Sequence, residues 1–231
     1  MTSSAATTPA TIGLLLGSLR QNGNNAGLAD WLTKVAQRSL ANTTADTAAT
    51  IQQVFPFPTT TAAADSSHLR YTGPVLDPHI PQAVTASSDY PSPLIQHWSA
   101  TVRHCAAFIL VTPQYNWGVP GELKNALDQL YHEWTGKPVL VVTYGGHGGN
   151  RCNEQLRMVM GGGLKMRTVE ERVEIVLPRE FITGERRVGD GGDDSFLEKY
   201  EVSLTRAIDA LVGMLQPAAA ADGATEAAGR V

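Results

Sequence analysis

The chain has 231 residues, 42% hydrophobic and 17% charged, which allows a hydrophobic core of ordinary size. Its formal net charge of −4 argues against a nucleic-acid-binding protein, because such proteins usually carry a basic patch. Two cysteines are too few for a disulfide framework or a zinc site. No apolar run approaches the ~20 residues of a membrane helix, and residues 1–10 do not resemble a secretory signal, so we expect a cytoplasmic protein.

Short apolar runs alternate with helical patterns from residue 11 onward, which is typical of a parallel α/β sheet. Residues 11–16 form a continuous apolar run of the kind expected for a buried parallel strand. Apolar residues at helical spacing follow over 28–36, and 51–55 is a second expected strand. We expect residues 1–10 to be flexible.

Residues 56–93 break this rhythm. They hold seven of the 13 prolines among many Ser and Thr residues, so a regular helix is excluded for most of the segment. The segment has too few apolar residues for a core of its own, and we interpret it as a long irregular excursion from one domain. A loop of this length in a compact fold is often functional or partly disordered.

Regular patterns return after residue 93 and predict alternating helices and strands. The expected elements are a helix at 94–103, a strand at 105–112, a helix over 123–134, a strand at 138–143, a helix at 150–160, a strand at 169–177 and a helix at 195–215. An Ala/Gly-rich tail, 217–231, is expected to be disordered. The sequence therefore predicts a single α/β domain over 11–216.

Three glycine-containing segments follow predicted strands, at 17–25, 112–121 and 143–150. In open parallel sheets, ligands bind at the carboxyl ends of strands near the point where the strand order reverses. We therefore expect the three segments to meet at one ligand-binding edge. Their shared position carries more weight than the composition of any one of them.

The first segment has the chemistry of an anion site. Ser18 and Asn25 can form hydrogen bonds, Arg20 can neutralise a dianion, and free N–H groups at the following helix start add donors. Gly17 and Gly23 permit tight backbone geometry. The pattern is neither a P-loop nor a GxGxxG fingerprint, so ATP and a Rossmann-bound dinucleotide are not favoured. The alternative is a turn that only caps a helix.

The second and third segments suit a flat ligand. Tyr115 and Trp117 could lie against its rings from a rigid Pro/Gly loop, or instead cover the sheet edge or a partner subunit. Four glycines over 145–149 would let a ligand approach the backbone closely, and a flexible turn is the alternative there. His147 could donate a proton to an acceptor, although a lone loop histidine often has no such role.

Two further candidates are weaker. His132 and Glu133 resemble the start of an HExxH motif, but Gly136 stands in place of the second histidine, so we expect salt bridges and no metal site. Cys152 lies near a helix N-terminus and is expected to be somewhat acidic, but nothing indicates a catalytic thiol.

Taken in order, these segments resemble the NADPH-dependent FMN reductase family, and most closely its yeast-type FMN-containing quinone reductases. The resemblance spans 11–53 and 102–176. It is carried by GSLR at 17–20, PQYNWG at 113–118, LKNALD at 123–128, YHEWTGKP at 131–138 and YGGHGG at 144–149.

The resemblance implies a flavodoxin-like three-layer sandwich with a five-stranded parallel sheet in the order 2-1-3-4-5, as a homodimer or homotetramer. It implies FMN as cofactor and NADPH or NADH as co-substrate. The FMN phosphate would be held by Ser18, Arg20 and Asn25. The ribityl chain and the ring would contact the segment of Pro113, Gln114, Tyr115, Asn116 and Trp117. The far side of the ring would contact Tyr144, Gly145 and Gly146.

The same resemblance implies hydride transfer from NAD(P)H through FMN to a small acceptor, a quinone, by a ping-pong scheme. It also implies that flavin N5 carries the chemistry and that no side chain is an essential acid or base. Two departures stand out. Gly23 replaces a phosphate-binding Ser or Thr that relatives often have, and 56–93 is expanded near the acceptor pocket. The alternatives are a general FMN, azo or metal-ion reductase, a flavin-containing redox sensor or interaction protein, and a flavin-free structural domain.

Overall fold

A computed structural model describes residues 9–41, 49–54 and 80–215. The expected flexible start and the expected disordered tail fall almost entirely outside these residues, as do residues 56–79 of the excursion. The part of the excursion that is described, from residue 80, contains two short 3-10 turns, Pro81–Ala83 and Ser87–Asp89, in otherwise irregular chain. This part agrees with the expectation that a regular helix is absent there.

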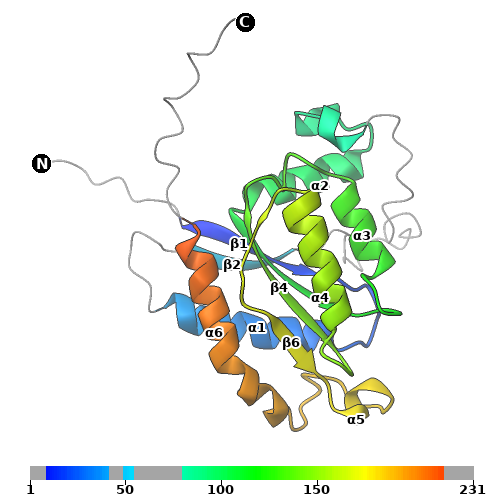
Figure 1. Cartoon of the computed structure of the whole chain (residues 1–231), viewed down its shortest axis with the longest axis vertical. Coiled ribbons are helices and arrows are strands. Elements are labelled where there is room, and N and C mark those ends of the chain that lie inside the picture. Colours follow the sequence, from blue (N-terminus) through cyan, green and yellow to red (C-terminus); the bar gives the residue numbers. More distant parts are fainter. Residues whose placement is uncertain (1–8, 42–48, 55–79, 216–231) are drawn as a thin grey trace, which may run out of the picture.

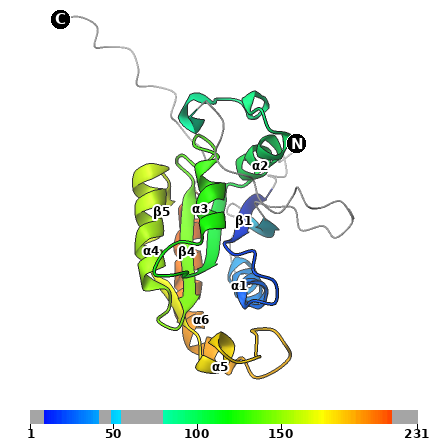
Figure 2. The same cartoon turned by 90° about the vertical axis from the view of Figure 1, so that its right-hand side faces the viewer.

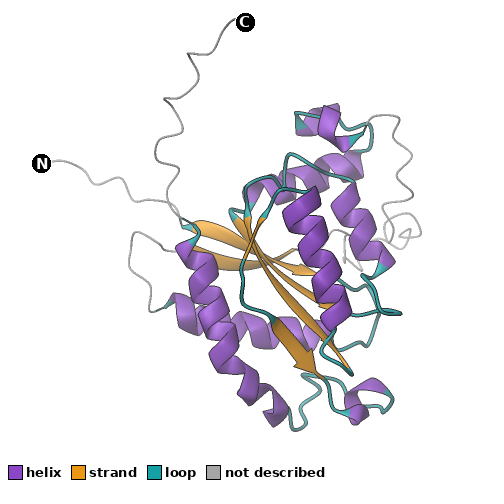
Figure 3. Cartoon of the chain, viewed as in Figure 1, coloured by secondary structure: helices purple, strands orange, loops and turns teal. Residues whose placement is uncertain are grey.

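Four long strands form the parallel sheet. They are β1 (Ala10–Leu16), β2 (Ala49–Val54), β3 (Ala107–Pro113) and β4 (Pro138–Gly145), each parallel to its neighbours. Figure 3 shows them as the orange centre of the molecule. All seven residues of β3 and the first seven of β4 are buried, because helices cover both faces of the sheet. The apolar runs at 105–112 and 138–143 therefore predicted these strands well.

The fifth position of the sheet is shared by two short strands, β5 (Arg167–Thr168) and β6 (Val173–Val176). Both pair in parallel with β4, β5 beside its start and β6 beside its end. The resulting order, β2-β1-β3-β4 and then β5 with β6, confirms the expected 2-1-3-4-5 arrangement. The strand expected at 169–177 is interrupted at its start and regular only over β6.

Helices cover the two faces of the sheet and complete the expected three-layer sandwich (Figures 1 and 2). The helices α1 (Asn25–Leu40) and α6 (Glu198–Gly213) share a core with one face. The helices α2 (Pro93–His104), α3 (Gly121–Asp128) and α4 (Asn150–Arg157) share a core with the other.

Each core is built from the side chains that the strands alternate between their two faces. Ile109 of β3 lies in the core with Leu28 of α1 and Leu204 of α6. Its neighbour Phe108 points the other way and joins the core of Trp98 from α2. The sheet is therefore held from both sides, and only its strand ends and the loops after them are left to form a site.

The helix expected over 123–134 is too long. The helix α3 ends at Asp128, and the chain continues in turns, with Trp134 N donating to the Tyr131 carbonyl. Trp134 is fully buried, contacts Trp98 and Phe108 edge to face, and donates from Nε1 to the Leu127 carbonyl. Its apolar side chain reaches the core from a turn, so helical spacing alone gave the wrong element.

The ends of two other helices also differ from expectation. After α4 the chain continues as a π-helix, Met158–Gly163, beyond the expected end at residue 160. The last helix begins with a 3-10 turn, Ser195–Leu197, before α6. A short helix, α5 (Arg179–Ile182), was not expected; it lies beyond the carboxyl ends of the strands (Figure 2).

Within the described residues, no helix combines the length and the apolar composition that crossing a membrane requires.

Candidate functional site

The loops after β1, β3 and β4 meet at one edge of the sheet, as expected. Since β2 and β3 lie on opposite sides of β1, the strand order reverses between β1 and β3, which is where ligands bind in such sheets. A cavity of about 200 Å³ lies at this edge. It is lined by Ser18, Arg20, Gln21, Asn22, Gly23, Asn24, Pro113, Tyr115, Tyr144, Phe181, Ile182 and Arg187.

A chain of hydrogen bonds joins the three loops beside this cavity. The hydroxyls of Ser18 and Tyr115 are 2.6 Å apart. Asn25 donates from Nδ2 to the Ser18 carbonyl at 3.3 Å, and the Tyr144 hydroxyl donates to Asn25 Oδ1 at 3.3 Å. Burial, together with Tyr115 nearby, raises the pKa of Tyr144, so its hydroxyl stays protonated and remains a donor. The three loops are thus held in one arrangement.

The anion-binding expectation for the first loop has a structural basis. The helix α1 begins at Asn25 with no side chain capping it and no carboxylate in its first turn, so its N-terminal backbone donors face the loop. The Arg20 guanidinium lies over the Tyr115 ring, 4.7 Å from its centre. Arg20 forms no ion pair with any described carboxylate. Its charge is therefore available to a ligand.

The two glycines of this loop differ in how much room they have. A Cβ on Gly17 would lie 2.5 Å from the side chain of Thr112, so a side chain there would collide with β3. A Cβ on Gly23 would lie 3.2 Å from the Arg20 carbonyl oxygen, which is closer than most such contacts and would require a small shift of the loop. A side chain at position 17 is therefore excluded by packing against β3, whereas a side chain at position 23 meets Arg20 of its own loop.

The loop after β3 is a two-residue hairpin turn. Tyr115 and Gly118 exchange backbone hydrogen bonds of 3.0 and 2.8 Å, and Asn116 and Trp117 between them have φ of +46° and +65°. A bulky residue in this left-handed conformation is strained, and such strain clusters at functional sites. Trp117 is 60% exposed, so it does not cover the sheet edge of its own chain.

Two side chains of the neighbouring loop accompany Trp117. Its ring is nearly parallel to that of His147, with centres 6.3 Å apart, and the Arg151 guanidinium lies 5.9 Å from its centre. His147 is exposed. The Trp117 side chain is therefore largely exposed, with His147 and Arg151 as its neighbours.

Gln114 connects the second loop to the third. Its side-chain oxygen accepts the backbone N–H groups of Arg151 and Cys152 at 3.0 and 3.1 Å, which caps the start of α4. Its own N–H donates to the Tyr144 carbonyl at 3.2 Å. Within the described residues the Gln114 oxygen thus serves a helix end, and its expected contact with a flavin stays a prediction.

The glycine-rich third loop is a bonded turn. Gly148 donates from N–H to the Gly145 carbonyl at 3.1 Å, and Thr143 Oγ1 donates to the Gly148 carbonyl at 2.8 Å. Gly148 and Gly149 have φ of +70° and +76°, and a Cβ on Gly149 would lie 2.9 Å from Thr143. Turn geometry therefore explains these glycines, while Gly146 is exposed at the edge beside Ile182.

A second cavity, of about 460 Å³, lies on the other side of Tyr115. It is lined by Tyr115, Asn116, Gly118, Val119, Lys124, Gln155, Met158 and Val159. Met158, at the start of the π-helix, is 67% exposed. Tyr115 thus separates a polar cavity from a more apolar one.

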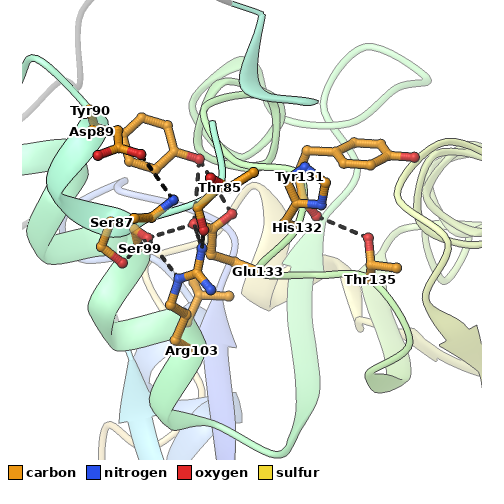
Figure 4. A network of polar contacts seen from close by, with 12 residues as sticks. Thr85, Ser87, Asp89, Tyr90, Ser99, Arg103, Tyr131, His132, Glu133 and Thr135 are labelled. Carbon is orange, nitrogen blue, oxygen red and sulfur yellow. Dashed lines mark hydrogen bonds and ion pairs between the residues drawn. The ribbon is translucent and has the colours of Figure 1, made fainter. Parts of the chain in front are cut away.

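Of the pair expected to form salt bridges, Glu133 forms one, with Arg103, and His132 forms none with a described residue (Figure 4). The carboxylate of Glu133 is buried and accepts hydrogen bonds from Ser99 Oγ at 2.6 Å, Arg103 at 3.0 Å and the Tyr90 hydroxyl. His132 contacts the Gln82 carbonyl at 2.8 Å. No cluster of metal ligands occurs among the described residues.

The expectation of a somewhat acidic Cys152 is wrong. The thiol is fully buried, and this burial raises its pKa to about 12. Loss of hydration disfavours the thiolate more than the nearby helix start favours it.

Six residues that line the first cavity were not singled out from the sequence. Three of them, Gln21, Asn22 and Asn24, belong to the first loop, and the other three come from a segment that was not expected at the site. Phe181, Ile182 and Arg187 come from α5 and the chain that follows it. This segment has no periodicity, and its only sequence signal was a pair of arginines after the last strand.

The family model for NADPH-dependent FMN reductases matches residues 10–176. The NAD(P)H-dependent FMN reductase LOT6 of Saccharomyces cerevisiae is 50% identical over 93 residues, 40% of this chain and 48% of that protein. An NAD(P)H-dependent FMN reductase of Schizosaccharomyces pombe is 53% identical over 85 residues, 37% of this chain and 42% of that protein. The chain thus spans about half the length of these relatives or less. A quinone reductase of Escherichia coli K12 is 32% identical over 152 residues, 63% of this chain and 66% of that protein.

Two solved structures share the fold. The flavoenzyme FerB, an NAD(P)H:(acceptor) oxidoreductase of Paracoccus denitrificans, aligns with a TM-score of 0.58 at 20% identity, over 89% of this chain and 97% of that one. An apo NADH:FMN oxidoreductase, EMOB, aligns with a TM-score of 0.52 at 19% identity, over 90% and 91%. With this fold and the match over 10–176, the chain belongs to the NADPH-dependent FMN reductase family.

Proposed function

We propose that this protein binds FMN where the loops after β1, β3 and β4 meet, and uses it to pass hydride from NAD(P)H to a small acceptor, a quinone. The observation that carries the proposal is the hydrogen-bonded chain from Tyr144 through Asn25 and Ser18 to Tyr115, which holds the three loops around one cavity. Membership of the family and the names of the relatives support the same function.

The residues present fit FMN. The lining of the first cavity includes two arginines and no carboxylate, and it adjoins the uncapped start of α1. A phosphate dianion is favoured in such surroundings. Tyr115 and Trp117 supply aromatic surface for a flat ring system beside the phosphate end.

We assign the following parts to the residues. Ser18 and Arg20 hold the phosphate, and Asn25 positions Ser18, since its side chain is already bonded to the Ser18 carbonyl and to Tyr144. Pro113, Gln114, Tyr115, Asn116 and Trp117 form the segment along the ribityl chain and ring, with Gln114 acting through the α4 cap. Tyr144, Gly145 and Gly146 complete the far side of the ring.

The bound FMN supplies the capacity to accept and release hydride. The protein binds it, orients it and leaves one side open. Trp117, held outward with His147 beside it, and the apolar second cavity offer a surface on which a nicotinamide and then a quinone can lie in turn. We propose a ping-pong scheme on this basis and assign no side chain as acid or base.

The visible spectrum of the purified protein tests cofactor binding. A flavin spectrum that bleaches on anaerobic addition of NADPH is expected. A colourless protein whose melting temperature does not rise with FMN would contradict the proposal.

Steady-state kinetics test the scheme and the acceptor. Parallel initial-rate lines at varied NADPH and quinone are expected, and intersecting lines would exclude the ping-pong scheme. Quinones should be reduced faster than free FMN, azo dyes or ferric complexes at equal NADPH, and another order of rates would change the proposed acceptor.

We also propose a homodimer or homotetramer in the cytoplasm, following the family resemblance and the composition. Light scattering of the eluted protein measures the assembly, and a monomer would contradict it.

A further inference from the structure

The chain after β6 closes one side of the first cavity. Three residues from this segment, Phe181, Ile182 and Arg187, line the cavity beside Arg20 and Ser18. The match to the family model ends at residue 176, so the segment lies outside it.

The segment is attached closely to the loop before α1. Asn24 donates from Nδ2 to the Phe181 carbonyl at 2.8 Å and accepts the N–H of Val188 at 2.9 Å. A Cβ on Gly27 would lie 1.8 Å from the Val188 carbonyl oxygen, so the two backbones are in direct contact. The position of the segment is thus set by the same residues that begin α1.

Arg187 is held in this position by backbone carbonyls. Its Nε donates to the Asn22 carbonyl at 2.6 Å, and one terminal nitrogen donates to the Gly184 and Arg186 carbonyls at 2.9 and 2.5 Å. Carbonyls orient a guanidinium but do not neutralise its charge.

The charge of Arg187 is not paired within the described chain. Its neighbour Arg186 forms ion pairs with Asp190 and Asp194, but no described carboxylate pairs with the Arg187 guanidinium. Its other terminal nitrogen donates to no described acceptor. Arg187 therefore brings an oriented, unpaired positive charge to a cavity that already contains Arg20.

We propose that Arg187 is a second cation for the FMN phosphate and acts together with Arg20. This inference rests on the proposed function. The specificity that Arg187 confers is for the phosphorylated flavin over the unphosphorylated one.

The test compares the affinities of apoprotein for FMN and for riboflavin, which lacks the phosphate. In Arg187→Gln, FMN affinity should fall by about tenfold or more, as expected for one charge-assisted contact to phosphate. Riboflavin affinity should stay within about twofold, because the ring-binding loops are unchanged. Fluorescence quenching on titration gives both constants, and a far-UV CD melt confirms that the variant is folded.

Two further variants separate charge from loop structure. Arg186→Gln removes a neighbouring charge that is already paired, and should leave the ratio of the two affinities unchanged. Arg187→Lys keeps the charge and should retain most of the ratio. The proposal would be overturned in favour of a structural role if Arg187→Lys and Arg187→Gln lowered the ratio of FMN to riboflavin affinity equally. It would also be overturned if Arg186→Gln lowered this ratio.

The outcomes for the inference and for the proposed function differ. A wild-type protein that binds neither flavin refutes the proposed function. A wild-type protein that prefers FMN, together with an Arg187→Gln protein of the same preference, refutes the inference alone.

Discussion

The hydroxyl groups of Ser18 and Tyr115, 97 positions apart in the sequence, form a hydrogen bond of 2.6 Å. Ser18 belongs to the loop before α1 and Tyr115 to the hairpin turn after β3. The bond therefore joins the proposed phosphate-binding loop directly to the proposed ring-binding loop.

Loss of this bond should be measurable as coupling between the two residues. Ser18→Ala and Tyr115→Phe should each lower the free energy of unfolding by about 1 kcal/mol, and the double variant by little more than either alone. Urea unfolding of the four proteins gives the coupling energy. Fully additive losses would show that the two hydroxyls do not act as a pair.

Gly27→Ala should displace the segment that ends at Val188, because the clash is with a backbone oxygen that no rotamer change relieves. We expect a loss of about 1–3 kcal/mol in the free energy of unfolding. Gly121→Ala is the matched control, since nothing lies within 4 Å of its added carbon. If both variants unfold at the same urea concentration, the contact between α1 and the segment is not tight.

Removing Arg103 should deprive the buried Glu133 carboxylate of the cation that contacts it directly. Arg103→Met is expected to lower the free energy of unfolding by about 2–4 kcal/mol, less than for a fully enclosed pair because the Arg103 side chain is 39% exposed. The loss of unfolding free energy caused by Arg103→Met should be smaller in a protein that also carries Glu133→Gln. A double-mutant cycle by urea unfolding measures the difference, and equal losses would argue against an ion pair of any strength.

The buried thiols give a pH dependence of known sign. Burial raises the pKa of Cys152 from 9.0 to about 12, and it raises the pKa of Cys105 as well. The folded state therefore keeps the Cys152 proton, whereas the unfolded state loses it above pH 9. The contribution of the protonated thiol to the free energy of unfolding is thus complete below pH 9 and declines between pH 9 and 12.

The comparison of wild type with Cys152→Ala isolates this effect. The difference in unfolding free energy should be constant from pH 7 to 8.5 and narrow by pH 10. Iodoacetamide at pH 8 should also label both cysteines far more slowly in folded than in urea-unfolded protein. Rapid labelling of folded Cys152 would mean that the thiol is neither buried nor weakly acidic.

Trp117 should show a trade-off between stability and activity. Trp117→Gly removes the strain of a bulky residue at φ +65° and exposes no core, so stability should be unchanged or rise by up to about 1 kcal/mol. The kcat/KM for a quinone should fall, because the outward aromatic face is lost. Trp117→Phe keeps that face and should retain activity; similar losses in both variants would point to the indole itself.

The sequence predicted the elements whose residues pack in the simplest way. The strands β3 and β4 are buried on both faces, so their apolar runs were unambiguous. Trp134 shows the opposite case, because its burial against Trp98 follows from a turn that apolar spacing cannot distinguish from a helix.

The three loops of the candidate site were predictable from the sequence, but the chain after β6 that closes the cavity was not. The loops follow strands, and strand order places their ends together. Arg187 reaches the cavity only through contacts of Asn24 and Asn22 with a distant irregular segment. The acidic character expected of Cys152 failed for a related reason, since its burial depends on how α4 packs.

The contact between Gly27 and Val188 also bears on how this chain could have diverged from its relatives. A glycine is required at position 27 only while the backbone at 188 lies against it. Substitutions at 27 and changes in the chain after 176 are therefore not independent during evolution. Homologues that lack the C-terminal segment should be free to carry alanine or larger residues at position 27, whereas those that keep it should keep the glycine.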